Sequence, residues 1–198
     1  MVLLIGGASC VGKTLMAQKL MEKYNIPYLS LDHLKMGIYR SNINCRFTPE
    51  SPDEIITQNL WPIIREMIKT NIENNQNIII EGCYFPDSIN DIGIDYMEKI
   101  LMFYIIFSEE YILKNINTKI FENCSIIEKR DRDGVLKYIN ENIERYKMDH
   151  KNRKEICLNN GIKYFEILEN YEKEIKNAYK WVEYILKNKD QKERGHIT

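Results

Sequence analysis

The sequence predicts an α/β fold in which a five-stranded parallel sheet carries helices on both faces. Two observations lead to this prediction. Five short apolar runs alternate with segments of helical spacing along the 198 residues, and such alternation is typical of a parallel sheet. The length fits one domain with its own core. The predicted strands are residues 2–5, 28–31, 78–81, 100–107 and 163–167.

The first predicted strand runs directly into a glycine-rich segment. Gly7 to Thr14 match the phosphate-binding pattern G-x-x-x-x-G-K-[ST] without a mismatch, and a helical pattern follows. Two glycines let the loop turn its N–H groups toward an anion. Lys13 would lie against the outer phosphates of a nucleotide, and the Thr14 hydroxyl would ligate Mg²⁺ directly. The predicted nucleotide-binding residues are Gly7, Ala8, Ser9, Cys10, Val11, Gly12, Lys13 and Thr14.

Acidic residues end the second and third predicted strands. Asp32 follows residues 28–31, and Glu81 ends residues 78–81. Ligands of open α/β sheets bind at these carboxyl ends. Asp32 could accept the proton of an acceptor hydroxyl, bind Mg²⁺ through water, or cap the helix that begins at His33. We expect Glu81 to contact the substrate or a water on the metal, or else to face solvent.

Three cations lie between Asp32 and the next long helix, namely Lys35, Arg40 and Arg46. Singly, each is more often a surface residue. Together they would suit an anionic acceptor, and we expect them to bind substrate.

The pattern from Ile55 to Ile72 predicts a helix, which Pro62 should kink or split. Residues 100–107 form the longest apolar run and predict a central strand, and Ser108 signals the start of a helix.

A charged segment at 128–133 precedes the last predicted strand. Arginine can close over a γ-phosphate and neutralise the charge that develops there, and Arg130 is the preferred candidate, with Lys129 and Arg132 beside it. Acidic residues alternate with these cations, so a solvated surface is the alternative. Farther along, we interpret a second set of cations as a solvated helix face, with the alternative that one of them reaches the nucleotide: Arg145, Lys147, Lys151 and Arg153.

Composition narrows the class of protein. A net charge of −1 gives no general reason to expect binding to nucleic acid or to a membrane, and no apolar run has the length of a membrane span. The five cysteines include no C-x-x-C pair, so we expect reduced thiols rather than a zinc site or a disulfide framework. No signal peptide is recognised, and a cytoplasmic location is expected.

The sequence resembles the P-loop small-molecule kinases in four features taken together. These are the phosphate loop, Asp32 after the second strand, Glu81-Gly82 at the end of the third, and a basic segment before the fifth. This group includes adenylate and shikimate kinases, chloramphenicol phosphotransferase and zeta toxin. The stretch from Ser30 to Gly37 is also similar to proteins described as 2-phosphoglycerate kinase-like. The resemblance implies a three-layer P-loop NTPase fold, the strand order 2-3-1-4-5, and ATP with Mg²⁺. It implies one kinase domain over 1–188, with an acceptor-binding insertion at about 33–75, a lid at about 119–155 and a polar tail at 189–198.

The expected function is therefore transfer of the γ-phosphate of Mg-ATP to a hydroxyl or phosphate of a small molecule. Lys13, Asp32 and Arg130 would be catalytic. A nucleoside monophosphate kinase is one alternative, and a nucleotide switch or NTPase acting with a macromolecular partner is another. The protein is expected to be a monomer or homodimer.

Overall fold

The computed structural model describes residues 1–41, 44–120, 137 and 139–194. Five parallel strands form one sheet in the order β2-β3-β1-β4-β5. The predicted strands and the strand order are confirmed. Their bounds are β1 (Val2–Gly7), β2 (Tyr28–Ser30), β3 (Ile78–Gly82), β4 (Ile100–Phe107) and β5 (Lys163–Ile167).

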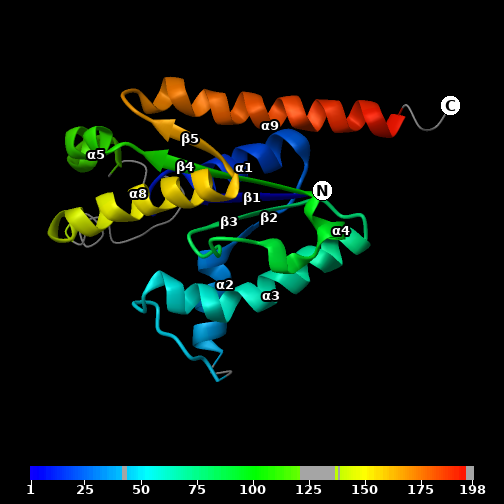
Figure 1. Cartoon of the computed structure of the whole chain (residues 1–198), viewed down its shortest axis with the longest axis horizontal. Coiled ribbons are helices and arrows are strands. Elements are labelled where there is room, and N and C mark those ends of the chain that lie inside the picture. Colours follow the sequence, from blue (N-terminus) through cyan, green and yellow to red (C-terminus); the bar gives the residue numbers. More distant parts are fainter. Residues whose placement is uncertain (42–43, 121–136, 138, 195–198) are drawn as a thin grey trace.

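Helices cover both faces of the sheet, as the three-layer prediction requires (Figure 1). One apolar core lies under α1 (Lys13–Tyr24) and α9 (Tyr171–Arg194), and the other lies under α3 (Asp53–Glu73). Strand β1 places Leu3 and Ile5 in the first core and Val2 and Leu4 in the second. Successive side chains of a strand point to opposite faces, so a central strand buried on both sides is apolar throughout.

Several other elements lie within the described residues. They are α2 (Leu31–Arg40), a 3₁₀ turn (Asn90–Ile92), α4 (Ile94–Met97), α5 (Glu109–Asn115), a π-helical turn (Ile116–Ile120) and α8 (Ile143–Asn160). Helix α8 packs on β4 and β5, which places it beside the carboxyl-terminal end of the sheet (Figure 1).

Three predictions about helix boundaries need correction. Helix α3 is not split at Pro62, because Trp61 and Ile64 on its buried side pack into the same core and hold the helix together. Helix α2 begins immediately after β2, so Ser30 precedes its first residue and Asp32 lies inside its first turn. Asp32 is therefore not the cap. Helix α9 continues to Arg194, so the predicted tail starts within a helix.

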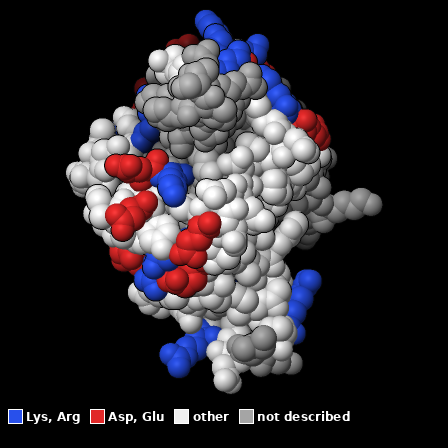
Figure 2. Space-filling model, turned by 90° about the vertical axis from the view of Figure 1, so that its right-hand side faces the viewer, with Lys and Arg blue, Asp and Glu red and all other residues white. Residues whose placement is uncertain are grey.

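Among the helices of the described residues, none has both the length and the apolar character needed to cross a bilayer. Figure 2 shows one face of the molecule, on which acidic and basic side chains lie close to one another. Wide areas of the same face carry no charged side chains. The described part of that face carries no broad basic surface.

Because all five strands are parallel, their carboxyl ends meet at one edge of the sheet. The phosphate loop follows β1, Asp32 follows β2, and Cys83 follows β3 at this edge. The fold therefore brings residues from distant parts of the sequence to one site.

Candidate active site

The loop between β1 and α1 has the backbone conformation of a phosphate cradle. Gly7 and Gly12 have φ angles of +149° and +88°, and Gly12 directly precedes the first turn of α1. A Cβ on Gly7 would come within 2.6 Å of the Ile105 carbonyl oxygen, so the loop has no room for a side chain there. The N–H groups at the start of α1 and the positive end of its dipole provide an anion site.

Lys13 lies inside the loop rather than on the surface. Its side chain is buried, and Nζ donates hydrogen bonds to the carbonyl oxygen of Ala8 (2.7 Å) and to Sγ of Cys83 (3.4 Å). Burial raises the pKa of the Cys83 thiol more than the nearby Lys13 lowers it, so Cys83 is a neutral thiol. The ammonium group is thus held at the mouth of the loop by two uncharged groups.

Thr14 of helix α1 and Glu81 at the end of β3 are in direct contact. The Thr14 hydroxyl donates a hydrogen bond of 3.1 Å to Oε1 of Glu81, which is only 2% exposed. Glu81 therefore does not face solvent. Burial raises the pKa of this carboxyl group, while Lys13 and the Thr14 hydroxyl oppose the shift.

The two oxygen donors fit a Mg²⁺ ion, which proteins bind through one or two side chains together with substrate phosphates and water. The described residues contain no group of three or more His, Cys, Asp and Glu side chains that could hold a metal without such help. Thr14 would hold the ion, with Glu81 beside it.

Asp32 and Lys35 form an ion pair one turn apart on α2, with 3.0 Å between Oδ1 and Nζ. Tyr84 joins both residues: Lys35 donates to its hydroxyl at 2.6 Å, and the hydroxyl donates to Asp32 Oδ1 at 3.3 Å. Burial and the Asp32 charge raise the pKa of Tyr84, which stays a donor at neutral pH. Lys35 and Tyr84 therefore fix the orientation of the Asp32 carboxyl group.

The cations that were predicted to bind substrate or nucleotide do not gather at one site in the described residues. Arg40 and Arg46 are exposed, and within the described residues neither forms an ion pair. Lys35 is buried, but its charge is already paired with Asp32. Arg130, with Lys129 and Arg132, lies outside the described residues, as do all of 121–136 and residue 138 of the predicted lid.

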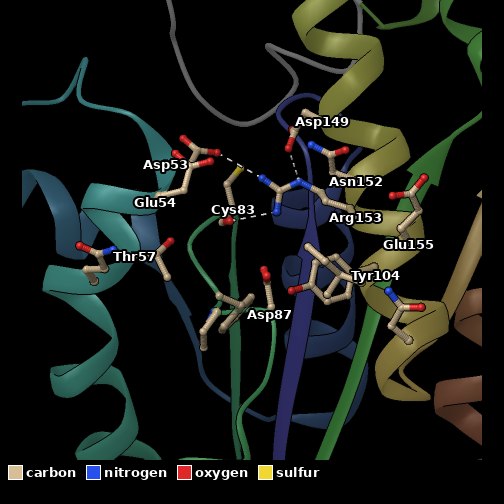
Figure 3. Close-up of a pocket in the computed structure, with 15 residues that line it drawn as sticks. Asp53, Glu54, Thr57, Cys83, Asp87, Tyr104, Asp149, Asn152, Arg153 and Glu155 are labelled. Atoms are coloured by element: carbon tan, nitrogen blue, oxygen red, sulfur yellow. Dashed lines mark hydrogen bonds and ion pairs between the residues drawn. The ribbon is translucent and has the colours of Figure 1, made fainter.

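Arg153 corrects the prediction of a solvated helix face on α8. The side chain is 7% exposed, and Nη1 donates to the Cys83 carbonyl oxygen at 3.1 Å. Nη2 contacts Asp53 Oδ2 at 3.2 Å, and Nε lies 2.8 Å from Asp149 Oδ1 (Figure 3). Burial disfavours the guanidinium charge, but Asp149 and the other groups around it together outweigh burial and raise the pKa of Arg153. Arg153 joins α8 to α3 and to the end of β3.

A pocket of about 500 Å³ lies around Arg153, between α3 and α8 (Figure 3). Its lining comprises Asp53, Glu54, Thr57, Gln58, Cys83, Phe85, Pro86, Asp87, Tyr104, Asp149, Asn152, Arg153, Glu155, Ile156 and Asn159. Cys83 lines this pocket and also contacts Lys13. The pocket therefore adjoins the phosphate loop.

Sequence reasoning missed α8 as a wall of the site, although a signal was present. The buried residues of α8 are Tyr146, His150, Arg153 and Cys157. Their spacing of four, three and four is that of one helix face. Arg153 lies on that face, and the residues around it in the sequence are mostly polar. Because an arginine is normally assigned to the surface, its charge hid the regular spacing of the buried residues.

Two tyrosines from distant helices hold the phosphate loop. The Tyr146 hydroxyl donates to the Ser9 carbonyl oxygen at 2.7 Å, and that of Tyr171 to the Val11 carbonyl oxygen at 3.2 Å. Cys10, between them, has a φ of +64°, a value that residues with a side chain seldom adopt. These two contacts fix the loop on both sides of that strained residue.

The cysteine prediction is only partly correct. Cys45, Cys83 and Cys157 are free thiols, as expected, but Cys10 is disulfide-bonded. Sequence spacing does not reveal which cysteines the fold brings together, which explains the error.

No family model matches the chain, and no curated protein is similar to it in sequence. Solved structures do resemble it. A sugar kinase from Janibacter sp. HTCC2649 superposes with a TM-score of 0.52 at 14% identity, over 92% of this chain and 94% of the other. The fold is that of the P-loop kinases.

Two further solved structures have the same fold as this protein. Dephospho-CoA kinase from Campylobacter jejuni gives a TM-score of 0.51 at 10% identity, over 95% of this chain and 98% of the other. An uncharacterized protein from Eubacterium ventriosum ATCC 27560 gives 0.50 at 18% identity, over 93% and 98%. At such identities the likeness establishes the shared fold but not the reaction.

Proposed function

We propose that this protein is an ATP-dependent phosphotransferase that phosphorylates a hydroxyl group of a small molecule. The observation that carries the proposal is the position of Cys83, which contacts Lys13 of the phosphate loop and also lines the pocket between α3 and α8. A phosphate donor on the loop and an acceptor in the pocket would therefore be neighbours.

The donor side rests on the loop at 7–14. Its backbone N–H groups and Lys13 would bind the phosphates of ATP, and Thr14 with Glu81 would hold Mg²⁺. The bound metal would neutralise charge on the phosphates. Lys13 is held by uncharged partners, so its charge is available to the γ-phosphate.

The acceptor side rests on Asp32. The acceptor oxygen forms a bond to the γ-phosphorus while the bond from that phosphorus to the β–γ bridging oxygen breaks, and ADP leaves. Asp32 does not line the pocket itself, so the reacting hydroxyl would have to extend from the pocket past Cys83 toward the phosphate loop. Its proton would then pass to the Asp32 carboxylate, which Lys35 and Tyr84 hold in place. A phosphate acceptor, as in a nucleoside monophosphate kinase, would need no such base.

Release of ADP in the presence of candidate acceptors tests the proposal. Neutral sugars, sugar acids, amino sugars, phosphoglycerates and nucleoside monophosphates should be compared at equal concentration. A kinase acting on a hydroxyl should release ADP at least about tenfold faster with one hydroxyl acceptor than with water alone. Stimulation by nucleoside monophosphates only would favour that alternative, and steady hydrolysis that no acceptor stimulates would favour an NTPase.

The matched variants are Lys13→Ala and Lys19→Ala. Both remove a lysine from α1, but only Lys13 is buried in the loop, and Lys19 is exposed. Lys13→Ala should abolish turnover, and Lys19→Ala should retain it. Equal activity of the two variants would contradict a catalytic loop.

A further inference from the structure

The lining of the pocket between α3 and α8 is strongly acidic. Five of its residues are carboxylates and one, Arg153, is a cation, so the formal charge of the lining is about −4 at neutral pH. Two carboxylates, Asp53 and Asp149, already pair with Arg153. The guanidinium group is thus committed to the protein.

The other three carboxylates have no cationic partner among the described residues. Glu54 comes from α3, Asp87 from the segment after β3, and Glu155 from α8. They therefore approach the pocket from three sides, as Figure 3 shows. Like charges around a concave surface concentrate a negative potential in it, which attracts a cation and repels an anion.

Tyr104 is an independent sign of a ligand site. Its side chain is 2% exposed and lines the pocket, yet its hydroxyl has no hydrogen-bond partner among the described residues. The ring lies across Gly6, where a Cβ would come within 2.5 Å of it, and the hydroxyl points between α3 and α8 toward Asp87 (Figure 3). Burial raises the pKa of this phenol, so it can donate a hydrogen bond. The ring is enclosed, but the hydroxyl oxygen opens into the pocket, where a bound ligand would be its partner.

We propose that the acceptor is a cationic molecule that carries amine as well as hydroxyl groups, such as an amino sugar or an amino cyclitol. This inference rests on the proposed function, because it assigns the pocket to the phosphoryl acceptor. The ammonium groups would lie among Glu54, Asp87 and Glu155, and a hydroxyl would bind Tyr104. A pocket of about 500 Å³ has room for one or two sugar rings.

The proposal replaces the earlier expectation of an anionic acceptor. That expectation depended on Lys35, Arg40 and Arg46. Lys35 is paired with Asp32, and the two arginines are absent from the pocket lining. An acidic ligand would meet three unpaired carboxylates and one arginine that two aspartates already neutralise.

Isothermal titration calorimetry without ATP tests the ligand class apart from turnover. The probes are two matched sets: glucosamine, glucose and gluconate, then 2-deoxystreptamine and myo-inositol. Each amine should bind at least about tenfold tighter than its neutral counterpart, and gluconate should bind weakest. Binding of the amines should weaken as salt is added.

Two sets of variants locate the site. The triple variant Glu54→Gln, Asp87→Asn, Glu155→Gln should lose at least about tenfold in affinity for the amines. The control Asp95→Asn, Glu98→Gln, Glu172→Gln removes the same charge from unpaired carboxylates outside the pocket and should bind like the wild type. Tyr104→Phe keeps the ring on Gly6 and should weaken binding by about fivefold.

The outcomes separate the two proposals. Neutral or acidic probes that bind as tightly as amines would overturn the inference. A triple variant with wild-type affinity for amines would also overturn it. So would a control variant that loses as much affinity for amines as the triple variant does. Turnover with anionic or neutral acceptors alone would also overturn it and leave the kinase proposal intact. Tight, carboxylate-dependent amine binding without any acceptor-stimulated ADP release would support the ligand class and overturn the kinase proposal.

Discussion

The hydroxyl of Tyr146, on helix α8, donates a hydrogen bond of 2.7 Å to the backbone carbonyl oxygen of Ser9 in the phosphate loop. Burial raises the pKa of Tyr146 well above its ordinary value, so the phenol keeps its proton. The contact links the loop at 7–14 to the helix that also carries Arg153. One wall of the pocket between α3 and α8 is therefore joined directly to the loop.

Replacing Tyr146 with phenylalanine removes this bond and keeps the ring. Because a neutral hydrogen bond contributes about 1 kcal/mol, the Kd for Mg-ADP should rise about fivefold. Titration calorimetry measures the change. Tyr184→Phe is the matched control, since Tyr184 lies exposed on α9. A Kd for the Tyr146 variant within twofold of the wild type would show that the loop keeps its shape without the contact.

Asp32→Asn should remove the proton acceptor and keep the shape of the site. The amide oxygen can still accept the bonds from Lys35 and Tyr84, so the fold and the KM should change little. General bases contribute about 10²–10⁴-fold, and kcat for a hydroxyl acceptor should fall by at least about 100-fold. Steady-state kinetics separates the two constants. Wild-type kcat in this variant would refute a catalytic role for Asp32.

His150 should make the protein less stable as the pH falls. It is 2% exposed, and its Nδ1 accepts a 2.9 Å hydrogen bond from the Phe107 N–H. Burial, with smaller contributions from Arg153 and Lys13, lowers its pKa from 6.5 to about 3. Between these values the unfolded chain binds a proton that the folded protein does not. The free energy of unfolding should therefore fall by up to about 1.4 kcal/mol for each pH unit below 6.5.

The variant His150→Asn isolates this contribution, because an asparagine oxygen can take the place of Nδ1. Urea denaturation at pH 6.5 and pH 5 should show that the wild type loses about 2 kcal/mol more than the variant. The control His33→Asn leaves His150 in place and should behave like the wild type. Equal losses in the His150 variant and the wild type would mean that this histidine does not stay neutral in the fold.

The sequence predicted well what depends on local pattern. The strand bounds follow from apolar runs, and the phosphate loop follows from a motif whose glycines, lysine and threonine act over eight consecutive residues. The contact between Thr14 and Glu81 was not predicted, because it depends on how the start of α1 lies against the end of β3. The parallel strands indicated only that both residues lie at the carboxyl edge of the sheet.

The pocket between α3 and α8 could not be predicted in the same way. Its walls come from α3, the segment after β3 and α8, and Arg153 is 100 residues from Asp53 in the chain. Lys35 and Arg153 each pair with an aspartate one turn away on the same helix, but Arg153 also reaches Asp53 on the distant helix α3. Charge along a sequence does not show which cations are already paired, so it does not show what net charge the lining of a pocket carries.

Arg153→Met should test how strongly this pairing holds the two walls together. The variant keeps an apolar side chain of similar length but breaks the contacts to Asp53, Asp149 and the Cys83 carbonyl oxygen. Removing one partner of a buried ionic network leaves the others without compensation, so the free energy of unfolding should fall by about 2–4 kcal/mol. The Tm should fall by about 5–15 °C. Arg145→Met, on the exposed side of the same helix, should shift the Tm by less than about 2 °C. Equal Tm values for the two variants would mean that Arg153 is retained for its ligand and not for the joining of α8 to α3.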